Sequence, residues 1–129
     1  MEVISLHQAI GRTEGLNKID VSYASGFIDG EGYLQFENVK YKRKRIEVVG
    51  TEFTPIRFLQ KLFGGRIYKA KPRITATGKR AKPQEIWVAL NETACAVCKA
   101  VLPYLKIPRK KEVATRIIKY YEWWEFILQ

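Results

Sequence analysis

The stretch SYASGFIDGEGY, residues 22–33, decides the fold of this chain. It closes a helical pattern that we predict from Val21 to Gly30, with Asp20 as the N-cap, since a carboxylate there can accept hydrogen bonds from the free N–H groups of the first turn. From Tyr33 onward the hydrophobic period changes to two, which is typical of a strand. The segment therefore predicts a helix that passes into a strand through three glycines and two acids.

The predicted helix has an apolar side and a side of small residues. At 100° per residue the apolar side holds Tyr23, Ala24, Phe27 and Ile28. On the other side, Ser22, Gly26 and Gly30 are spaced by four, which lets a second helix approach closely, although each glycine costs roughly 1 kcal/mol relative to Ala. Because the chain has no second copy of this segment, we predict a symmetric homodimer. The predicted dimer interface consists of Ser22, Ser25, Gly26, Asp29 and Gly30.

The two acids of the segment, Asp29 and Glu31, end the helix beside the predicted twofold axis. Carboxylates that face a phosphate backbone repel it unless a cation lies between, and a few hard oxygen ligands completed by water and phosphate describe a Mg²⁺ site. Such a metal can lower the pKa of a water for attack on phosphorus and stabilise the leaving oxygen. The alternative is that both acids only terminate the helix, and their spacing leaves the two interpretations open.

Two strand pairs follow the opening helix. Apolar and polar residues alternate in the first pair, around residues 33–48, and the second pair covers about 66–71 and 84–90. We predict an α+β (α/β) fold in the order α-β-β-α-β-β-α-α, with one antiparallel four-stranded sheet, helices on one face and the other face bare. Residues 20–129 are expected to form a single domain, and residues 1–19 an N-terminal arm of uncertain order.

Three further helices are predicted from hydrophobic periodicity and from the capping and helix-breaking residues that flank it. The first covers residues 53–63, with Thr54 as its N-cap, and ends at two glycines. The second follows a capping Asn91, and the last runs from about residue 110 to 127. Its apolar stripe consists of Val113, Ile117, Tyr121 and Trp124. We expect the Tyr and Trp side chains of this helix in the core rather than as stacking platforms.

The chain is strongly basic, and its charge is unevenly distributed. Over 129 residues, 23 Lys and Arg oppose 13 acids, a net charge of +10. Residues 1–39 hold two basic and six acidic residues, a net −4, so residues 40–129 carry +14. We expect a polyanionic partner, and double-stranded DNA before a membrane, because no basic segment presents a lipid-facing side. The alternative is a basic protein whose charges are merely solvated.

The bare face of the predicted sheet carries mixed polar residues suited to reading bases. A two-stranded ribbon fits the DNA major groove, where Arg can read guanine, Gln adenine, and Glu can accept from cytosine, while Lys holds phosphates. The tract KYKRKR, residues 40–45, also resembles a localisation signal, but its place between two apolar runs favours a strand or hairpin tip. The predicted DNA-binding residues are Tyr33, Gln35, Glu37, Lys42, Arg43, Arg45, Glu47, Tyr68, Lys69, Lys71 and Arg73.

Other classes of function find little support in the sequence. No run of 18 apolar residues and no leader pattern occurs, so we expect an intracellular protein, in a bacterial or phage-infected cytoplasm or an organelle, without a membrane partner or a small-molecule substrate. Cys95 and Cys98 fall three apart in a helical segment, far from His7. Small core residues are therefore favoured over a redox or zinc site.

Residues 24–32, ASGFIDGEG, resemble the LAGLIDADG motif of homing endonucleases in its GF-[IV]-DG-[DE]-G form. The resemblance continues, in the family's order, through VVGT (48–51), FLQKLFGG (58–65), IY (67–68), LPYL (102–105) and RKK (109–111). It covers nearly the whole chain from about residue 20 to 129.

The resemblance implies an αββαββα homing-endonuclease fold whose sheet is a DNA-binding saddle. It implies intron homing: double-strand breaks at a long, roughly palindromic site by metal-dependent phosphodiester hydrolysis, with Mg²⁺ as cofactor and Mn²⁺ as substitute. A single motif implies the homodimeric type. Glu31 matches the family's metal ligand, Gly30 the backbone carbonyl beside it, and Asp29 an acid that makes a structural contact at the helix end.

Two positions depart from the family's pattern. The polar residue that positions water falls at Gly50 or Thr51. The basic catalytic residue falls by spacing on Pro108, which cannot serve, so Arg109 or Lys110 must substitute. The implied catalytic residues are Glu31, Thr51, Arg109 and Lys110.

These departures keep a second hypothesis open: a catalytically weak or inactive DNA-binding regulator, or an RNA-splicing maturase, on the same fold. The intact Glu31 favours the enzyme, because a pure binder would gain by removing a carboxylate that faces phosphate.

Overall fold

The computed structural model describes residues 5–37, 43–70, 74, 76–79 and 82–128. Its elements are α1 (Leu6–Thr13), α2 (Lys18–Glu31), β1 (Gly32–Phe36), β2 (Lys44–Gly50), α3 (Phe53–Phe63), β3 (Arg66–Ala70), β4 (Gln84–Leu90), α4 (Asn91–Val101), the short 3-10 helix η1 (Leu102–Tyr104) and α5 (Pro108–Leu128). The predicted order of elements is confirmed from α2 onward, and α1 precedes it.

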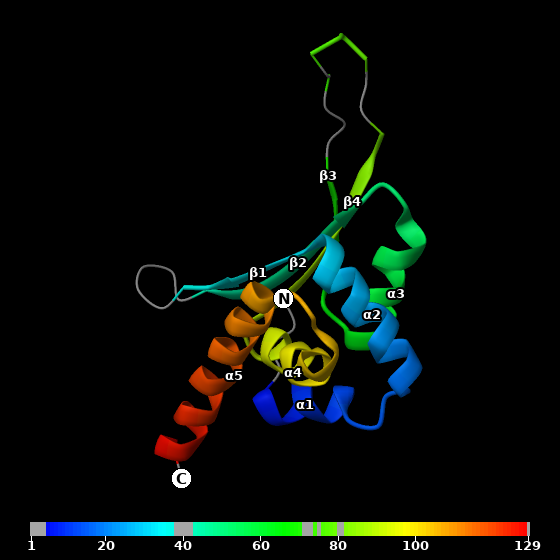
Figure 1. Cartoon of the computed structure of the whole chain (residues 1–129). Helices are drawn as coiled ribbons and strands as arrows, with labels where there is room; N and C mark the ends of the chain where they lie inside the picture. The colour runs from blue at the N-terminus through cyan, green and yellow to red at the C-terminus, as the bar shows by residue number, and fades with distance from the viewer. Residues whose placement is uncertain (1–4, 38–42, 71–73, 75, 80–81, 129) are drawn as a thin grey trace.

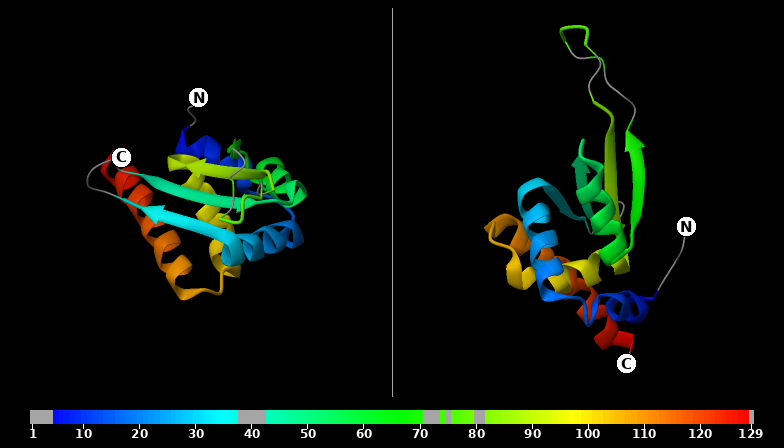
Figure 2. Two further views of the ribbon diagram at one scale, coloured as in Figure 1. Left: turned by 90° about the horizontal axis from the view of Figure 1, so that it is seen from above. Right: turned by 90° about the vertical axis from the view of Figure 1, so that its right-hand side faces the viewer.

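The strands form one antiparallel four-stranded sheet in the order β1-β2-β4-β3. Val48 at its centre pairs with Gly32 of β1 and with Trp87 of β4. The helices cover one face of this sheet, and no other described element covers the opposite face (Figures 1 and 2). The predicted α+β class, with helices on one face, is confirmed.

The core lies between the helices and the covered face of the sheet. Alternate strand residues enter it, and they include Leu34, Ile46, Val48, Trp87 and Ala89. Trp87 is fully buried, and its Nε1–H donates to the carbonyl of Gly64 at 2.8 Å. The approach requires glycine at the next position, because a Cβ on Gly65 would lie 2.7 Å from the carbonyl oxygen of Val88.

The N-terminal segment differs from its prediction as an arm of uncertain order. Ser5 caps α1 in a reciprocal capping box with Gln8. Ala9 is buried, and α1 packs against α4. The helix is only eight residues long and contains Gly11, so its pattern was not recognised as a helix.

The first residue of α2 is Lys18 rather than Val21. Asn17 is the N-cap, and its Oδ1 accepts from the N–H groups of Ile19 at 2.8 Å and Asp20 at 3.2 Å. Asp20 is therefore not the cap but lies in the first turn, where its charge suits the helix dipole.

Two other predicted caps are also wrong. α3 follows Glu52, so Thr54 lies inside the helix. Asn91 is the first residue of α4 rather than its cap, and it has a φ of +52°. Neither helix has a side-chain hydrogen bond at its N-cap.

The C-terminal turns of α5 are more exposed than predicted. Ile117 is buried, but Trp123 and Trp124 are 54% and 40% exposed. The end of α5 extends beyond the body of the domain (Figure 1), so the expectation that its Trp side chains lie in the core is wrong. No helix in the described part of the chain is long and apolar enough to span a membrane.

Candidate nucleic-acid interface

The end of α2 is fastened to the start of α5 by reciprocal hydrogen bonds. The Asp29 carboxylate accepts from the backbone N–H groups of Lys106 at 2.6 Å and Ile107 at 3.1 Å. The Lys110 ammonium in turn donates to the carbonyls of Ile28, at 3.0 Å, and Asp29. These carbonyls lie in the last turn of α2, where the helix dipole favours a cation. We call this arrangement the α2–α5 clamp, and it confirms the prediction that Asp29 makes a structural contact.

Glu31 is exposed at the last position of α2. The chain turns tightly after it, since a Cβ on Gly32 would lie 2.5 Å from the carbonyl oxygen of Ile28. Because Gly32 pairs with Val48, Glu31 lies at the same end of the sheet as the β2–α3 connection, which contains the exposed Thr51. The clamp brings Lys110 to the same helix end.

The oxygen atoms at the end of α2 have the chemistry that Mg²⁺ prefers. The Glu31 carboxylate and the Gly30 carbonyl are hard donors, and an exposed carboxylate leaves room for water ligands. Among the described residues, no group of three or more His, Cys, Asp or Glu side chains is placed to hold a metal ion.

The uncovered face of the sheet carries polar side chains from several strands. Tyr33 and Gln35 of β1 lie opposite Glu47 and Arg45 of β2. Tyr68 of β3 shares their face, because it pairs with Ile86, two residues from Val88, the partner of Glu47. Arg45 and Glu47 form an ion pair. The Nε of Arg45 is buried and, within the described residues, has no hydrogen-bond partner. Buried donors in this state are rare in folded proteins.

The remaining predicted DNA-binding residues are placed less uniformly. Lys69 is exposed but belongs to the covered face, because it pairs with Glu85, which is buried on the helix side. Glu37 and Arg43 extend the β1–β2 ladder, with a backbone hydrogen bond of 2.7 Å from the Glu37 N–H to the Arg43 carbonyl. Lys42, Lys71 and Arg73 lie outside the described residues.

The exposed face of α2 contains only part of the predicted dimer interface. Ser22, Gly26 and Gly30 are exposed, and outside the adjacent residues and the backbone of α2 itself no described atom lies within 4 Å of a Cβ built on either glycine. Ser25 is fully buried and donates its hydroxyl to the carbonyl of Val21 at 2.7 Å. Its assignment to a dimer interface is therefore wrong.

Two large apolar side chains complete this exposed face. Ile19 is 79% exposed and Tyr23 57%, although Tyr23 was expected on the buried side. Tyr23 packs edge-to-face on Phe27 and Phe58, at ring-centroid distances of 5.1 and 5.5 Å. The helical wheel did not separate Tyr23 from the core because it stands at the border of the apolar arc. Asp29, also predicted in the dimer interface, is half-buried in the α2–α5 clamp.

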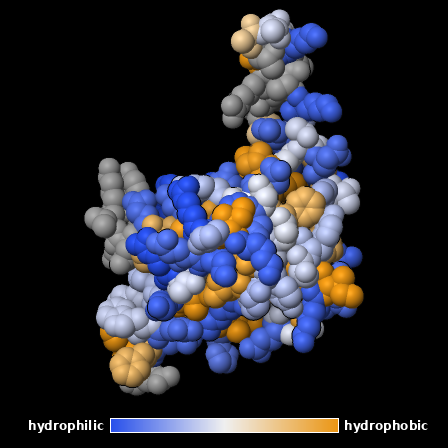
Figure 3. Space-filling model, in the orientation of Figure 1, coloured by the Kyte–Doolittle hydropathy of each residue, from blue (hydrophilic) through white to orange (hydrophobic). Residues whose placement is uncertain are grey.

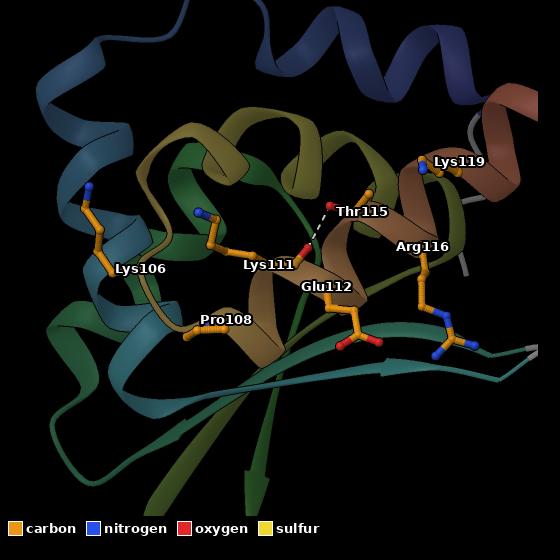
Figure 4. A pocket seen from close by; sticks show the side chains of 7 residues that line it. All are labelled: Lys106, Pro108, Lys111, Glu112, Thr115, Arg116 and Lys119. Atoms are coloured by element: carbon orange, nitrogen blue, oxygen red, sulfur yellow. Dashed lines mark hydrogen bonds between the residues drawn. The ribbon is translucent and has the colours of Figure 1, made fainter.

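A basic groove runs along the outer side of α5 (Figure 4). It has a volume of about 500 Å³ and is lined by Lys106, Pro108, Lys111, Glu112, Thr115, Arg116 and Lys119. Hydrophilic side chains gather over this part of the surface, where α5 begins (Figure 3). We call it the α5 groove. The groove was not predicted from the sequence, although the four-residue spacing of Lys111, Thr115 and Lys119 indicates that they share one helix face.

One member of the basic tract is buried in the interior. Lys44 is 1% exposed on the covered face of β2, and its ammonium lies 3.7 Å from the ring centroid of Tyr120 and 5.3 Å from that of Phe36. Contacts of a desolvated cation with aromatic rings are worth about 2 kcal/mol. Through Tyr120, Lys44 therefore connects β2 to α5.

Cys95 and Cys98 are buried free thiols in α4, as predicted for small core residues. Burial raises the pKa of Cys95 to about 12. It also raises the pKa of Cys98 well above its usual range. Both thiols are therefore protonated near neutral pH, whereas metal binding or nucleophilic chemistry would need a thiolate.

Comparison of the sequence with models of known protein families gives no match, and searches among curated proteins and among solved structures likewise find no similar protein. Function is therefore inferred from the residues of the chain itself.

Proposed function

We propose that the chain is a sequence-specific DNA endonuclease of the LAGLIDADG homing type, acting as a homodimer. The observation that carries the proposal is that the Lys110 ammonium is held on the last turn of α2, the helix that Glu31 ends as an exposed residue, beside an uncovered sheet face. A carboxylate that can hold a metal and a fixed ammonium are groups suited to phosphodiester hydrolysis. The polar residues of the sheet face, among them Gln35 and Arg45, are suited to bases in the major groove.

The proposed dimer packs two copies of α2 together. Gly26 and Gly30 have open space at the Cβ position, so no described contact within one chain requires glycine there, while each glycine costs roughly 1 kcal/mol. The exposed Ile19 and Tyr23 add apolar area to the same face. A second α2, approaching closely over the glycines, accounts for both features.

The proposed active site uses one Glu31 from each copy. Glu31 and the Gly30 carbonyl would hold Mg²⁺, or Mn²⁺ in its place, and the bound ion would activate water and stabilise the leaving oxygen. Lys110 is held on the last turn of α2, from where its ammonium stabilises charge that develops on the phosphate. Thr51 is proposed to orient water and Arg109 to contact the phosphate backbone of the DNA. Both residues are exposed.

A randomised duplex library tests the proposal. A subset of sequences should be cut in both strands with Mg²⁺ and bound without cutting with Ca²⁺. Glu31→Gln should abolish cutting and leave affinity roughly unchanged, because it removes the ligand charge and little volume. Glu14→Gln, the same change at an exposed position after α1, should cut like the parent chain.

Two results would contradict the proposal. Selective binding without cuts in either ion would favour the non-cleaving alternatives, a DNA-binding regulator or an RNA-splicing maturase, to which the proline at position 108 lends support. Unchanged cutting by Glu31→Gln would remove Glu31 from the mechanism.

A further inference from the structure

The outward face of α5 combines the α5 groove with exposed aromatic rings. Lys111 and Lys119 line the groove, and Trp123 and Phe126 continue the same helical face toward the C-terminus. Trp123 is 54% exposed and Phe126 76%. The opposite side of the helix is buried, as Ile117 shows. One helix face thus presents cations followed by rings.

The charges along this face are arranged for a linear polyanion. Lys106, Lys111, Arg116 and Lys119 line the groove against one acid, Glu112. Lys106 and Lys119 stand at its two ends (Figure 4). From Lys111 to Lys119 the helix rises about 12 Å, so a single ligand must present several negative charges in a row to meet them. Phosphates along a nucleic-acid strand meet this requirement.

One cation of the groove is held in place by an aromatic ring. The guanidinium of Arg116 lies 4.8 Å from the ring centroid of Phe36 on β1. A cation fixed in this way loses less conformational freedom when it binds a phosphate.

The aromatic end of the face distinguishes a single strand from a duplex. A duplex keeps the faces of its bases stacked inside, so an exposed indole gains little from it. An unpaired base offers its face to the ring. We propose that the outer face of α5 binds single-stranded nucleic acid, with Lys111, Arg116 and Lys119 on phosphates and Trp123 stacked on a base. This activity is separate from the proposed cleavage of duplex DNA, which uses the sheet face.

Labelled oligo(dU) and oligo(U) of equal length, with a duplex of that length for comparison, test the proposal by fluorescence anisotropy. Trp123→Ala should weaken single-strand binding on the order of ten-fold, whereas Trp123→Phe should retain most of the affinity. Lys119→Gln should weaken it several-fold and reduce the salt slope by about 0.7. Lys61→Gln, the same charge change at an exposed position on α3, should alter neither quantity.

A second readout does not depend on charge. In a Trp124→Phe background, Trp123 is the exposed indole and Trp87 is fully buried, so bound oligonucleotide should quench Trp123 fluorescence. Glu112→Gln should strengthen binding, because it removes the acid from the groove.

The outcomes separate clearly. Dependence on Trp123 and Lys119 for either oligonucleotide supports the proposal, and the ratio of the two affinities identifies the preferred sugar. The proposal would be overturned if Trp123→Ala and Lys119→Gln bound single strands as tightly as Lys61→Gln does. It would also be overturned if these variants lost duplex binding equally, or if bound oligonucleotide did not quench Trp123 fluorescence.

Discussion

Asp29 and Glu31 are separated by one residue but have different surroundings. Asp29 is half-buried and accepts hydrogen bonds from the backbone of Lys106 and Ile107, whereas Glu31 is exposed at the end of the sheet. The first acid holds two helices together, and the second is exposed to solvent. Substitution of each acid should therefore affect a different property.

Asp29→Ala should lower the free energy of unfolding by about 2 kcal/mol, because two N–H groups lose a charged acceptor. Urea denaturation measures this change. Glu31→Ala is the matched control and should stay within about 0.5 kcal/mol of the parent chain, as is usual for exposed positions. Equal losses in the two variants would contradict the division of roles.

The surroundings of a single residue could be predicted from the sequence only where neighbouring residues or a known motif determine them. Asp29 was assigned to structure and Glu31 to metal from the resemblance, and the clamp supports the first assignment. The burial of Lys44 was missed, because its aromatic partner Tyr120 lies far away in sequence. Ser25 was misplaced because its hydroxyl bonds within the helix and so tolerates burial.

At the level of elements, α2 shows which glycines the chain itself needs. Gly32 lets the helix turn directly into β1, since a Cβ there would clash with Ile28. Gly26 and Gly30 have no such neighbour among the described atoms. Their role is therefore expected outside the single chain.

Gly26→Leu should convert the proposed dimer to a monomer without unfolding it. The Leu side chain has open space in the monomer but prevents a second α2 from approaching. Sedimentation velocity measures the change. Gly11→Leu on α1, where the Cβ position is also open, should leave the dimer intact. A dimer that survives Gly26→Leu would show that the two copies do not pack through this face.

The positions of helices were predicted closely where the hydrophobic period agrees with the proline and glycine residues that begin and end the helix. α3 covers Phe53–Phe63 as predicted, because a proline opens its first turn and two glycines follow its end. The existence of α1 was missed because the helix is short and contains a glycine, and the start of α2 was missed because Asn17 and Asp20 are competing caps. The exposure of Trp123 could not be foreseen, because an apolar stripe does not tell where the rest of the domain ends.

Across the whole molecule, two surfaces with different chemistry face away from the core. The uncovered sheet face offers mixed polar groups, and the outer face of α5 offers cations and rings. The first is proposed to read duplex DNA and the second to hold a single strand. The net charge of +10 predicted a polyanionic partner, but only the folded arrangement shows that four of the basic residues line one groove on α5.

A mixed dimer tests the central claim, that two copies each use Glu31 to cut one strand. A dimer of one unchanged copy and one Glu31→Gln copy, purified through two different tags, is incubated with Mg²⁺ and a supercoiled plasmid that carries the selected site. The mixed dimer should accumulate nicked circles, while the unchanged dimer gives linear plasmid and the Glu31→Gln dimer leaves it supercoiled. Linear product from the mixed dimer at the rate of the unchanged dimer would contradict the claim.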